Sequence, residues 1–139
     1  MRLIWTVALV CFVACDNSLT APAGVRFNVA ERAFVLPDTV VATVTNQSST
    51  GFSVEPCGIV LQVQSGDSWK NAALEACRTQ ANASKELWLL RDGQPLRLDY
   101  PLPLATVPGT YRLAIQVLTL QGDVARGTIT SNAFQVESR

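Results

Sequence analysis

The sequence predicts an all-β domain, an antiparallel β-sandwich of about seven to nine strands. Short β-branched segments follow one another, turn residues separate them at close spacing, and little room is left for a helix. The most regular segment spans 111–117, where a two-residue period places four apolar side chains on one face: Tyr111, Leu113, Ile115 and Val117. Such alternation is typical of a half-buried strand, because successive side chains point to opposite faces of a sheet.

The first predicted strands lie between residues 25 and 54. Residues 25–29 alternate, and residues 40–45 are rich in β-branched side chains before a polar turn at 46–49. Residues 52–54 are short and stop before Pro56, whose ring removes a ladder donor. These segments predict strands joined by tight connections.

The next segment predicts a hairpin that carries two cysteines. Residues 59–64 and 69–74 flank a Ser-Gly-Asp-Ser turn. Folding the chain about Asp67 sets Val63 opposite Asn71 and brings Cys57 opposite Cys77. We therefore predict a structural disulfide between Cys57 and Cys77, with a metal pair or two reactive thiols as the alternatives. Closing the loop between Cys57 and Cys77 contributes about 3 kcal/mol to the free energy of unfolding in the chain-entropy model.

The last predicted strands follow a loop-like segment at 78–85. Residues 87–90 and 96–100 are separated by an Asp-Gly turn, and three prolines between 101 and 108 interrupt the ladder. A Gly-Asp turn at 122–123 leads into the final segment, in which Phe134 and Val136 alternate. We assign residues 25–139 to one domain, which is large enough for a hydrophobic core.

The amino-terminal residues predict an export signal. Arg2 precedes an apolar run that ends before Asp16, which is shorter than the 20 or so residues a membrane span needs. The end of that run, Phe12-Val13-Ala14-Cys15, resembles the lipobox of bacterial lipoproteins, with Phe12 where that family usually has Leu. The resemblance implies that 1–14 is a signal peptide, that Cys15 is lipidated and that 15–24 is a tether. Alternatively, ordinary signal peptidase cleaves after Ala23.

The composition of the chain argues against several classes of function. Lys+Arg and Asp+Glu each number 11, so the chain has no net charge to attract nucleic acid, and we expect no nucleic-acid partner. The chain has no histidine, which excludes Ser-His-Asp and Cys-His catalysis and the commonest metal ligand. No Gly-rich phosphate loop or clustered oxygen ligands stand out. We expect no enzyme activity, no cofactor and no metal.

Three motifs resemble bacterial immunoglobulin-like domains carried by lipoproteins. They are Val44-Thr45-Asn46-Gln47-Ser48, Gly66-Asp67-Ser68-Trp69 and Val107-Pro108-Gly109-Thr110-Tyr111-Arg112-Leu113. The resemblance covers residues 25–136 and implies an immunoglobulin-like sandwich. A tyrosine near the start of the penultimate strand also fits a tyrosine corner, in which its hydroxyl bonds to backbone upstream. We predict this structural role for Tyr111.

These observations predict a non-catalytic, lipid-anchored protein of the bacterial cell envelope, facing the periplasm or the surface. It would contact a membrane through the lipid on Cys15 and bind an envelope protein or glycan. The alternative is a protease-inhibitor-like or carbohydrate-binding module that acts through loops 46–52, 78–86 or 101–108. We expect Trp69 and Trp88 to pack in the core, whereas the position of Tyr100 stays open.

Overall fold

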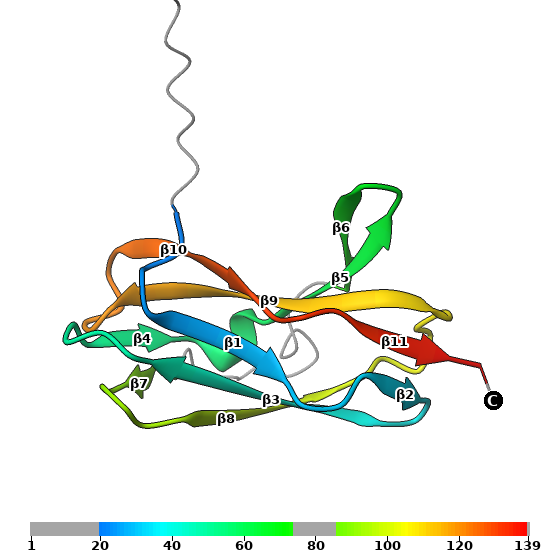
Figure 1. Ribbon diagram of the computed structural model, residues 1–139, viewed down its shortest axis with the longest axis horizontal. Helices are drawn as coiled ribbons and strands as arrows, with labels where there is room; N and C mark the ends of the chain where they lie inside the picture. Colours follow the sequence, from blue (N-terminus) through cyan, green and yellow to red (C-terminus); the bar gives the residue numbers. More distant parts are fainter. Residues whose placement is uncertain (1–19, 74–85, 139) are drawn as a thin grey trace, which may run out of the picture.

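The protein is a two-layer, all-β sandwich, here described by a computed structural model for residues 20–73 and 86–138 (Figure 1). These residues form eleven strands and one short 3₁₀ helix. The strands are β1 (Val25–Val29), β2 (Ala33–Val35), β3 (Thr39–Asn46), β4 (Phe52–Val54), β5 (Val60–Ser65), β6 (Ser68–Ala73), β7 (Trp88–Leu90), β8 (Leu96–Pro101), β9 (Gly109–Thr119), β10 (Ala125–Thr130) and β11 (Phe134–Glu137), and the helix is η1 (Pro56–Gly58).

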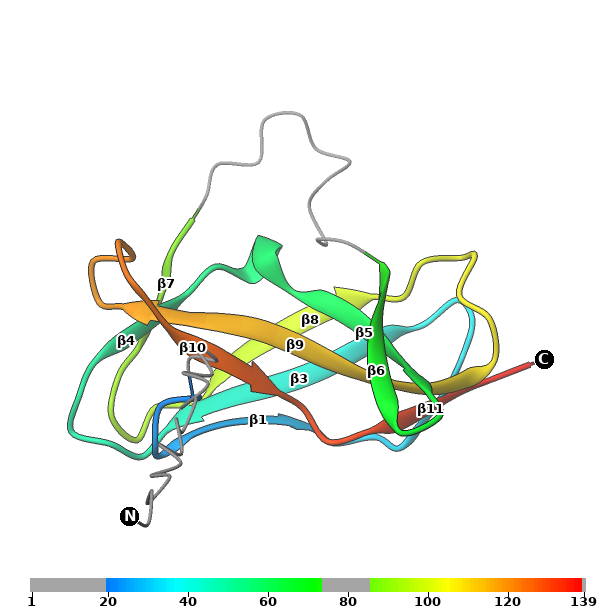
Figure 2. The same cartoon turned by 90° about the horizontal axis from the view of Figure 1, so that it is seen from above.

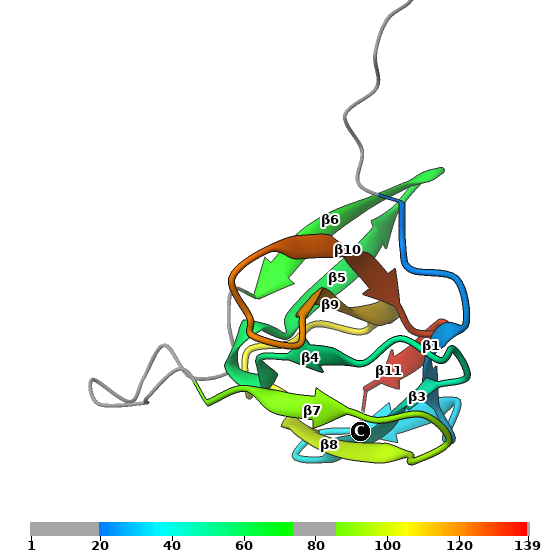
Figure 3. The same cartoon turned by 90° about the vertical axis from the view of Figure 1, so that its left-hand side faces the viewer.

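The two layers differ in size. The small sheet has the order β1-β3-β8 and is antiparallel throughout. The large sheet is built around the long strand β9, which pairs with β10 and β11 along one edge and with β4 and β5 along the other. Strand β7 continues the large sheet beyond β4, and β6 continues it beyond β5. Figure 3 looks along the strands and shows the two layers end-on.

One hydrophobic core fills the space between the sheets. The predicted face of residues 111–117 is confirmed, since Tyr111, Leu113, Ile115 and Val117 are all buried. The opposite wall comes from β3, where Val40, Ala42 and Val44 are buried, and from Leu98 and Tyr100 of β8. Alternating apolar residues therefore face each other across the sandwich.

The sandwich departs from the prediction in strand number and in one direction of pairing. There are eleven strands instead of seven to nine, because β2 lies where no strand was predicted and the single segment predicted after the turn at 122–123 divides into β10 and β11. The predicted antiparallel sandwich is confirmed, with one parallel pairing, of β2 with β11, in the large sheet. The chain changes layers between β1 and β2, so one amino-terminal segment pairs with both sheets.

The β5–β6 hairpin stands out from the large sheet (Figure 1) and corrects a second expectation. Val63 lies opposite Lys70 instead of Asn71, because the turn contains only Gly66 and Asp67. A bulge beside Leu61 then restores the predicted register, with Leu61 opposite Ala73. A two-residue turn with glycine at positive φ fits the twist of a hairpin, and Gly66 has φ 63°.

Candidate functional site

The predicted lipidation residue, Cys15, and the predicted signal peptide lie outside the described residues. The described chain begins at Thr20, within the predicted tether. Of the predicted binding loops, 46–52 and 101–108 are described in full, and only residue 86 of loop 78–86 is. The described candidate regions are the point where the chain enters β1 and the loops at the two ends of the sandwich.

Residues 20–24, the described part of the predicted tether and called the tether below, leave the sandwich beside β1 and β10 (Figure 2). The carbonyl of Gly24 accepts a hydrogen bond from the Gln47 amide at 2.9 Å, so the chain enters β1 next to the β3–β4 loop. Further out, the chain lies directly on β10. A Cβ added to Gly127, which has φ 146°, would lie 2.6 Å from the Thr20 carbonyl oxygen. Gly127 thus provides the space in which the tether backbone crosses the strand.

The end from which the tether leaves is held by a buried asparagine. Asn46 donates from its side-chain amide to the carbonyls of Thr50 at 2.7 Å and Leu90 at 3.1 Å. Its side-chain oxygen accepts from the Ser48 amide at 3.0 Å and from the Ser48 hydroxyl at 2.7 Å. Asn46 is fully buried, and its own carbonyl accepts from the Gly93 amide. One side chain therefore ties loop 46–52 to the β7–β8 turn.

The opposite end carries the predicted tyrosine. The Tyr111 hydroxyl donates to the carbonyl of Val107 at 2.7 Å, which is the hydrogen bond that a tyrosine corner requires. Its ring stacks on Phe134, with centroids 6.4 Å apart. Burial raises the pKa of the Tyr111 phenol, and the hydrogen bond to Val107 opposes that rise. Tyr111 therefore fixes the loop that connects β8 to β9.

That loop and the β5–β6 hairpin enclose an apolar pocket of about 210 Å³. The hairpin contributes Leu61, Val63 and Ala72, and Tyr111 lies beside them. The loop is itself folded, because the Thr106 amide and hydroxyl both donate to the Pro103 carbonyl. Residues 103–107 supply the other wall, through Pro103, Ala105, Thr106 and Val107.

The rim of the pocket is unusually apolar for a loop. Leu104 is 80% exposed and Val107 is 64% exposed. Single exposed apolar residues are ordinary, but two beside an apolar pocket form a surface suited to a macromolecular partner. Loop 101–108 thus has a built pocket beside it. In Figure 2 it lies at the opposite end of the sandwich from the start of β1.

The outer face of the large sheet holds a polar and aromatic cluster. Arg112, Gln62 and Asn71 are paired in register across β9, β5 and β6. Arg112 donates to the Gln62 side chain at 2.8 Å, and Gln62 donates to Asn71 at 3.1 Å. The guanidinium of Arg112 also lies over the Trp69 ring, 4.4 Å from its centroid. Burial lowers the pKa of Arg112.

The aromatic residues therefore lie elsewhere than expected. The prediction that Trp69 packs in the core was wrong, since Trp69 is half-buried on the outer face beneath Arg112. The shifted hairpin register explains this, because it sets Trp69 opposite Gln64. Trp88 is half-buried and packs against the core, whereas Tyr100 is buried within it, where burial raises its pKa.

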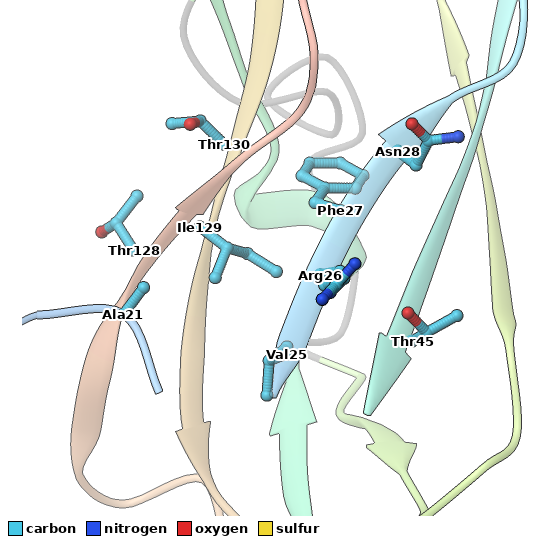
Figure 4. A pocket seen from close by; sticks show the side chains of 9 residues that line it. All are labelled: Ala21, Val25, Arg26, Phe27, Asn28, Thr45, Thr128, Ile129 and Thr130. Carbon is cyan, nitrogen blue, oxygen red and sulfur yellow. The ribbon is translucent and has the colours of Figure 1, made fainter. Parts of the chain in front are cut away.

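A groove of about 550 Å³ separates β1 from β10 (Figure 4). Its base holds the buried apolar side chains of Val25, Phe27 and Ile129, and its rim is polar. Asn132 links the two layers beyond it, because its side chain accepts from the Val29 amide and donates to the Val29 carbonyl. The groove is the seam between two strand edges and carries no charged cluster.

The predicted disulfide lies only half within the described residues. Cys57 lies in η1 and is not a free thiol. Cys77 lies outside the described residues, so the pairing of Cys57 with Cys77 stays a prediction.

Within residues 20–73 and 86–138, no three His, Cys, Asp or Glu side chains come together as metal ligands would. In the same ranges, no helix is long and apolar enough to span a bilayer. No protein-family model and no curated protein matches the chain.

Two functional features were missed by sequence reasoning. The 46–49 segment was interpreted as a polar turn, yet Asn46 is buried; its place at the end of an apolar alternating strand was the signal. The role of Gly127 has no local signal, because it depends on a segment more than a hundred residues earlier.

Proposed function

We propose that the protein is a non-catalytic, lipid-anchored module of the bacterial cell envelope, exported and held to a membrane through a lipid on Cys15. Its immunoglobulin-like sandwich binds or spaces another envelope macromolecule. The observation that carries the proposal is that the tether and the apolar pocket lie at opposite ends of the sandwich. The tether leaves beside loop 46–52, whereas the apolar pocket and the exposed Leu104 lie at the other end.

The length of the sandwich supports this division. Strand β9 has 11 residues and connects the far pocket to the tether end, a distance of about 33 Å at 3.3 Å per residue. A lipid near Thr20 would therefore keep loop 101–108 well clear of the bilayer surface. Two or more acyl chains anchor a protein stably, since each buried CH₂ contributes about 0.8 kcal/mol.

The proposed export also suits the predicted disulfide. Disulfides persist in exported compartments. A bond from Cys57 to Cys77 would close the open end of the β5–β6 hairpin, which forms one wall of the pocket. The bond would thus hold the pocket wall rather than join the two sheets.

The anchor is tested by fractionating cells that express matched variants. Cys11→Ser removes a thiol from the leader and should leave the protein in the membrane fraction. A version in which residues 1–15 are replaced by an ordinary cleavable leader should be recovered in the soluble fraction. If that version sediments with membranes as firmly as the natural chain, lipid anchoring is not what holds the protein there.

The far-end site is tested by photo-crosslinking in intact cells. A benzophenone amino acid at Leu104 should give an adduct of one defined mass with an envelope component. The same amino acid at Ser49, in the tether-end loop 46–52, should not give that adduct. Identical adducts at both positions would show that the pocket end has no special role.

A second function, carbohydrate binding, is favoured by the cluster around Trp69. Protein surfaces hold sugars by stacking on an aromatic ring beside amide and guanidinium donors, and Trp69, Gln62, Asn71 and Arg112 supply these groups on one face. Titration with soluble cell-wall glycan fragments, followed by calorimetry, tests it. Binding should be lost in Trp69→Ala and kept in Gln116→Ala, which alters an exposed residue of β9. Absence of binding by the natural chain rejects this function.

A further inference from the structure

Exposed apolar side chains gather near the tether end of the large sheet. Leu120 is 45% exposed and Val124 is 50% exposed, and both lie in the turn that joins β9 to β10. Leu89 is 46% exposed and Leu87 is 36% exposed, in β7 and just before it. We call these four residues the tether-end patch.

The members of the patch belong to one surface. Leu87 lies against Gly122, at the tip of the β9–β10 turn, and Leu120 lies against Gly51. Leu89 and the half-buried Leu118 are both paired with Ser53, one on each side of β4. The patch therefore runs from β7 across β4 to the turn beside β10, on neighbouring strands of the large sheet. Exposed apolar residues gathered on neighbouring strands mark a contact with a partner or a membrane.

Chain length places the proposed anchor close to this patch. Cys15 is five residues before Thr20, and an extended chain spans at most about 3.6 Å per residue, so Cys15 lies within about 18 Å of Thr20. Thr20 itself crosses β10 at Gly127. Val124 is three residues before Gly127, which is about 10 Å along the chain.

We propose that the tether-end patch rests in the interfacial region of the membrane that carries the lipid anchor. The inference rests on the lipid anchor of the proposed function and adds an orientation to it. With Leu120 and Val124 at the headgroup boundary, the long axis of the sandwich is steered away from the bilayer, and loop 101–108 faces outward. An untethered patch of this size would bind weakly, but the anchor holds it at high local concentration.

The contact is apolar rather than electrostatic. Exposed cations lie nearby, Arg91 beside β7 and Arg126 in β10, but carboxylates outnumber them, with Asp92 and Asp123 in the same segments, Glu86 before Leu87 and Glu55 beside it. This excess of negative charge gives no attraction to anionic headgroups. Contact should therefore be at least as strong on neutral as on anionic vesicles, and it should not weaken with salt.

The test uses the intact lipidated protein in phosphatidylcholine vesicles, with a benzophenone amino acid at Val124 or, as the matched control, at exposed Leu104. After irradiation, mass spectrometry of the peptides should show a phospholipid adduct at position 124 at least about tenfold more abundant than at 104. Circular dichroism confirms that both variants are folded.

Three results would overturn the inference. Equal or absent lipid adducts on a protein whose intact mass includes the acyl chains reject the orientation and leave the anchor standing. Adducts from position 124 to a second copy of the chain assign the patch to self-association. An intact mass without acyl chains rejects the anchor and, with it, the premise of the orientation.

A second measurement uses hydrogen exchange. On vesicles, the amides of residues 119–125 should exchange more slowly than in detergent-free solution of the unlipidated domain. The slowing should be lost in Leu120→Ser/Val124→Ser and kept in Leu104→Ser/Val107→Ser. Equal behaviour of the two double variants would contradict the proposed contact.

Discussion

The two ends of the sandwich are built differently. At the tether end, Asn46 makes four side-chain hydrogen bonds that join loop 46–52 to the β7–β8 connection. At the far end, the Tyr111 hydroxyl donates to Val107 and the Leu102 amide donates to Asp38, and these bonds hold loop 101–108 beside an apolar pocket. We infer that the tether end fixes the orientation of the domain and that the far end keeps a binding surface accessible.

The largest expected effect comes from Asn46→Ala. The substitution removes the four hydrogen bonds, including the one to the buried Leu90 carbonyl, so we expect a loss of about 3 kcal/mol in the free energy of unfolding. Chemical denaturation measures it. Gln47→Ala, at the exposed neighbouring position, should cost less than about 0.5 kcal/mol. If the two variants were equally stable, the buried amide would not be what holds this end.

The second effect concerns the docking of the tether. Gly127→Ala adds a Cβ where Thr20 and Ala21 lie, at a φ that L-residues rarely adopt, and should cost about 2 kcal/mol. The control is Gly66→Ala, which has positive φ but nothing within 4 Å of the added Cβ.

The same two substitutions separate the cost of backbone strain from the cost of steric collision with the tether. In a chain that begins at Pro22, the cost of Gly127→Ala should fall while that of Gly66→Ala is unchanged. If shortening the chain altered neither cost, the tether would not be docked on β10.

The third effect tests the far end. Tyr111→Phe removes the hydrogen bond to Val107 and should cost about 1 kcal/mol, with faster hydrogen exchange in residues 101–108. Tyr100→Phe is the matched control, since its hydroxyl makes no hydrogen bond to the described residues. Exchange in that loop that did not respond to Tyr111→Phe would contradict the role of the tyrosine.

Tyr111 also predicts a pH dependence. Because burial raises the pKa of its phenol in the folded chain, folding favours the protonated form. The resulting stabilisation is complete below the unfolded pKa of about 10 and is lost as pH rises through the higher folded pKa. The decline in stability above about pH 10 should therefore be smaller in Tyr111→Phe than in the natural chain. Identical alkaline profiles would rule out a contribution from this group.

The smallest expected loss of stability comes from a substitution on the outer face of the large sheet, between the two ends of the sandwich. Arg112→Met keeps much of the side-chain length but loses the contact with Trp69 and the bond to Gln62, and should cost about 0.5–1 kcal/mol. Thermal unfolding and the Trp69 emission wavelength measure it. Because neither end is altered, the hydrogen-exchange pattern of loops 46–52 and 101–108 should not change.

Sequence reasoning predicted the layers better than the connections. The alternation of residues 111–117 identified a core face correctly, because a two-residue period leaves little choice of which side is buried. The hairpin around Asp67 was off by one position near its turn, because a two-residue turn and a bulge beside Leu61 depend on backbone geometry. The parallel pairing of β2 with β11 joins an early strand to the last described one, and no local sequence pattern predicts such a long-range pairing.

The candidate site was predictable to a smaller extent. The Pro-Gly-Thr-Tyr segment predicted the position of Tyr111 at the start of a strand, and the structure gives its hydroxyl the upstream carbonyl of Val107. The pocket beside it could not be foreseen, because it forms where the β5–β6 hairpin leans over a loop 40 or so residues away. The buried position of Asn46 likewise needs the β7–β8 turn, which lies far along the chain.

The intact mass of the mature protein, purified from membranes, tests the central claim most directly. The account predicts a chain that begins at Cys15, lacks residues 1–14 and carries the added mass of acyl chains. An unmodified chain that begins at Gly24, after cleavage at Ala23, would contradict it.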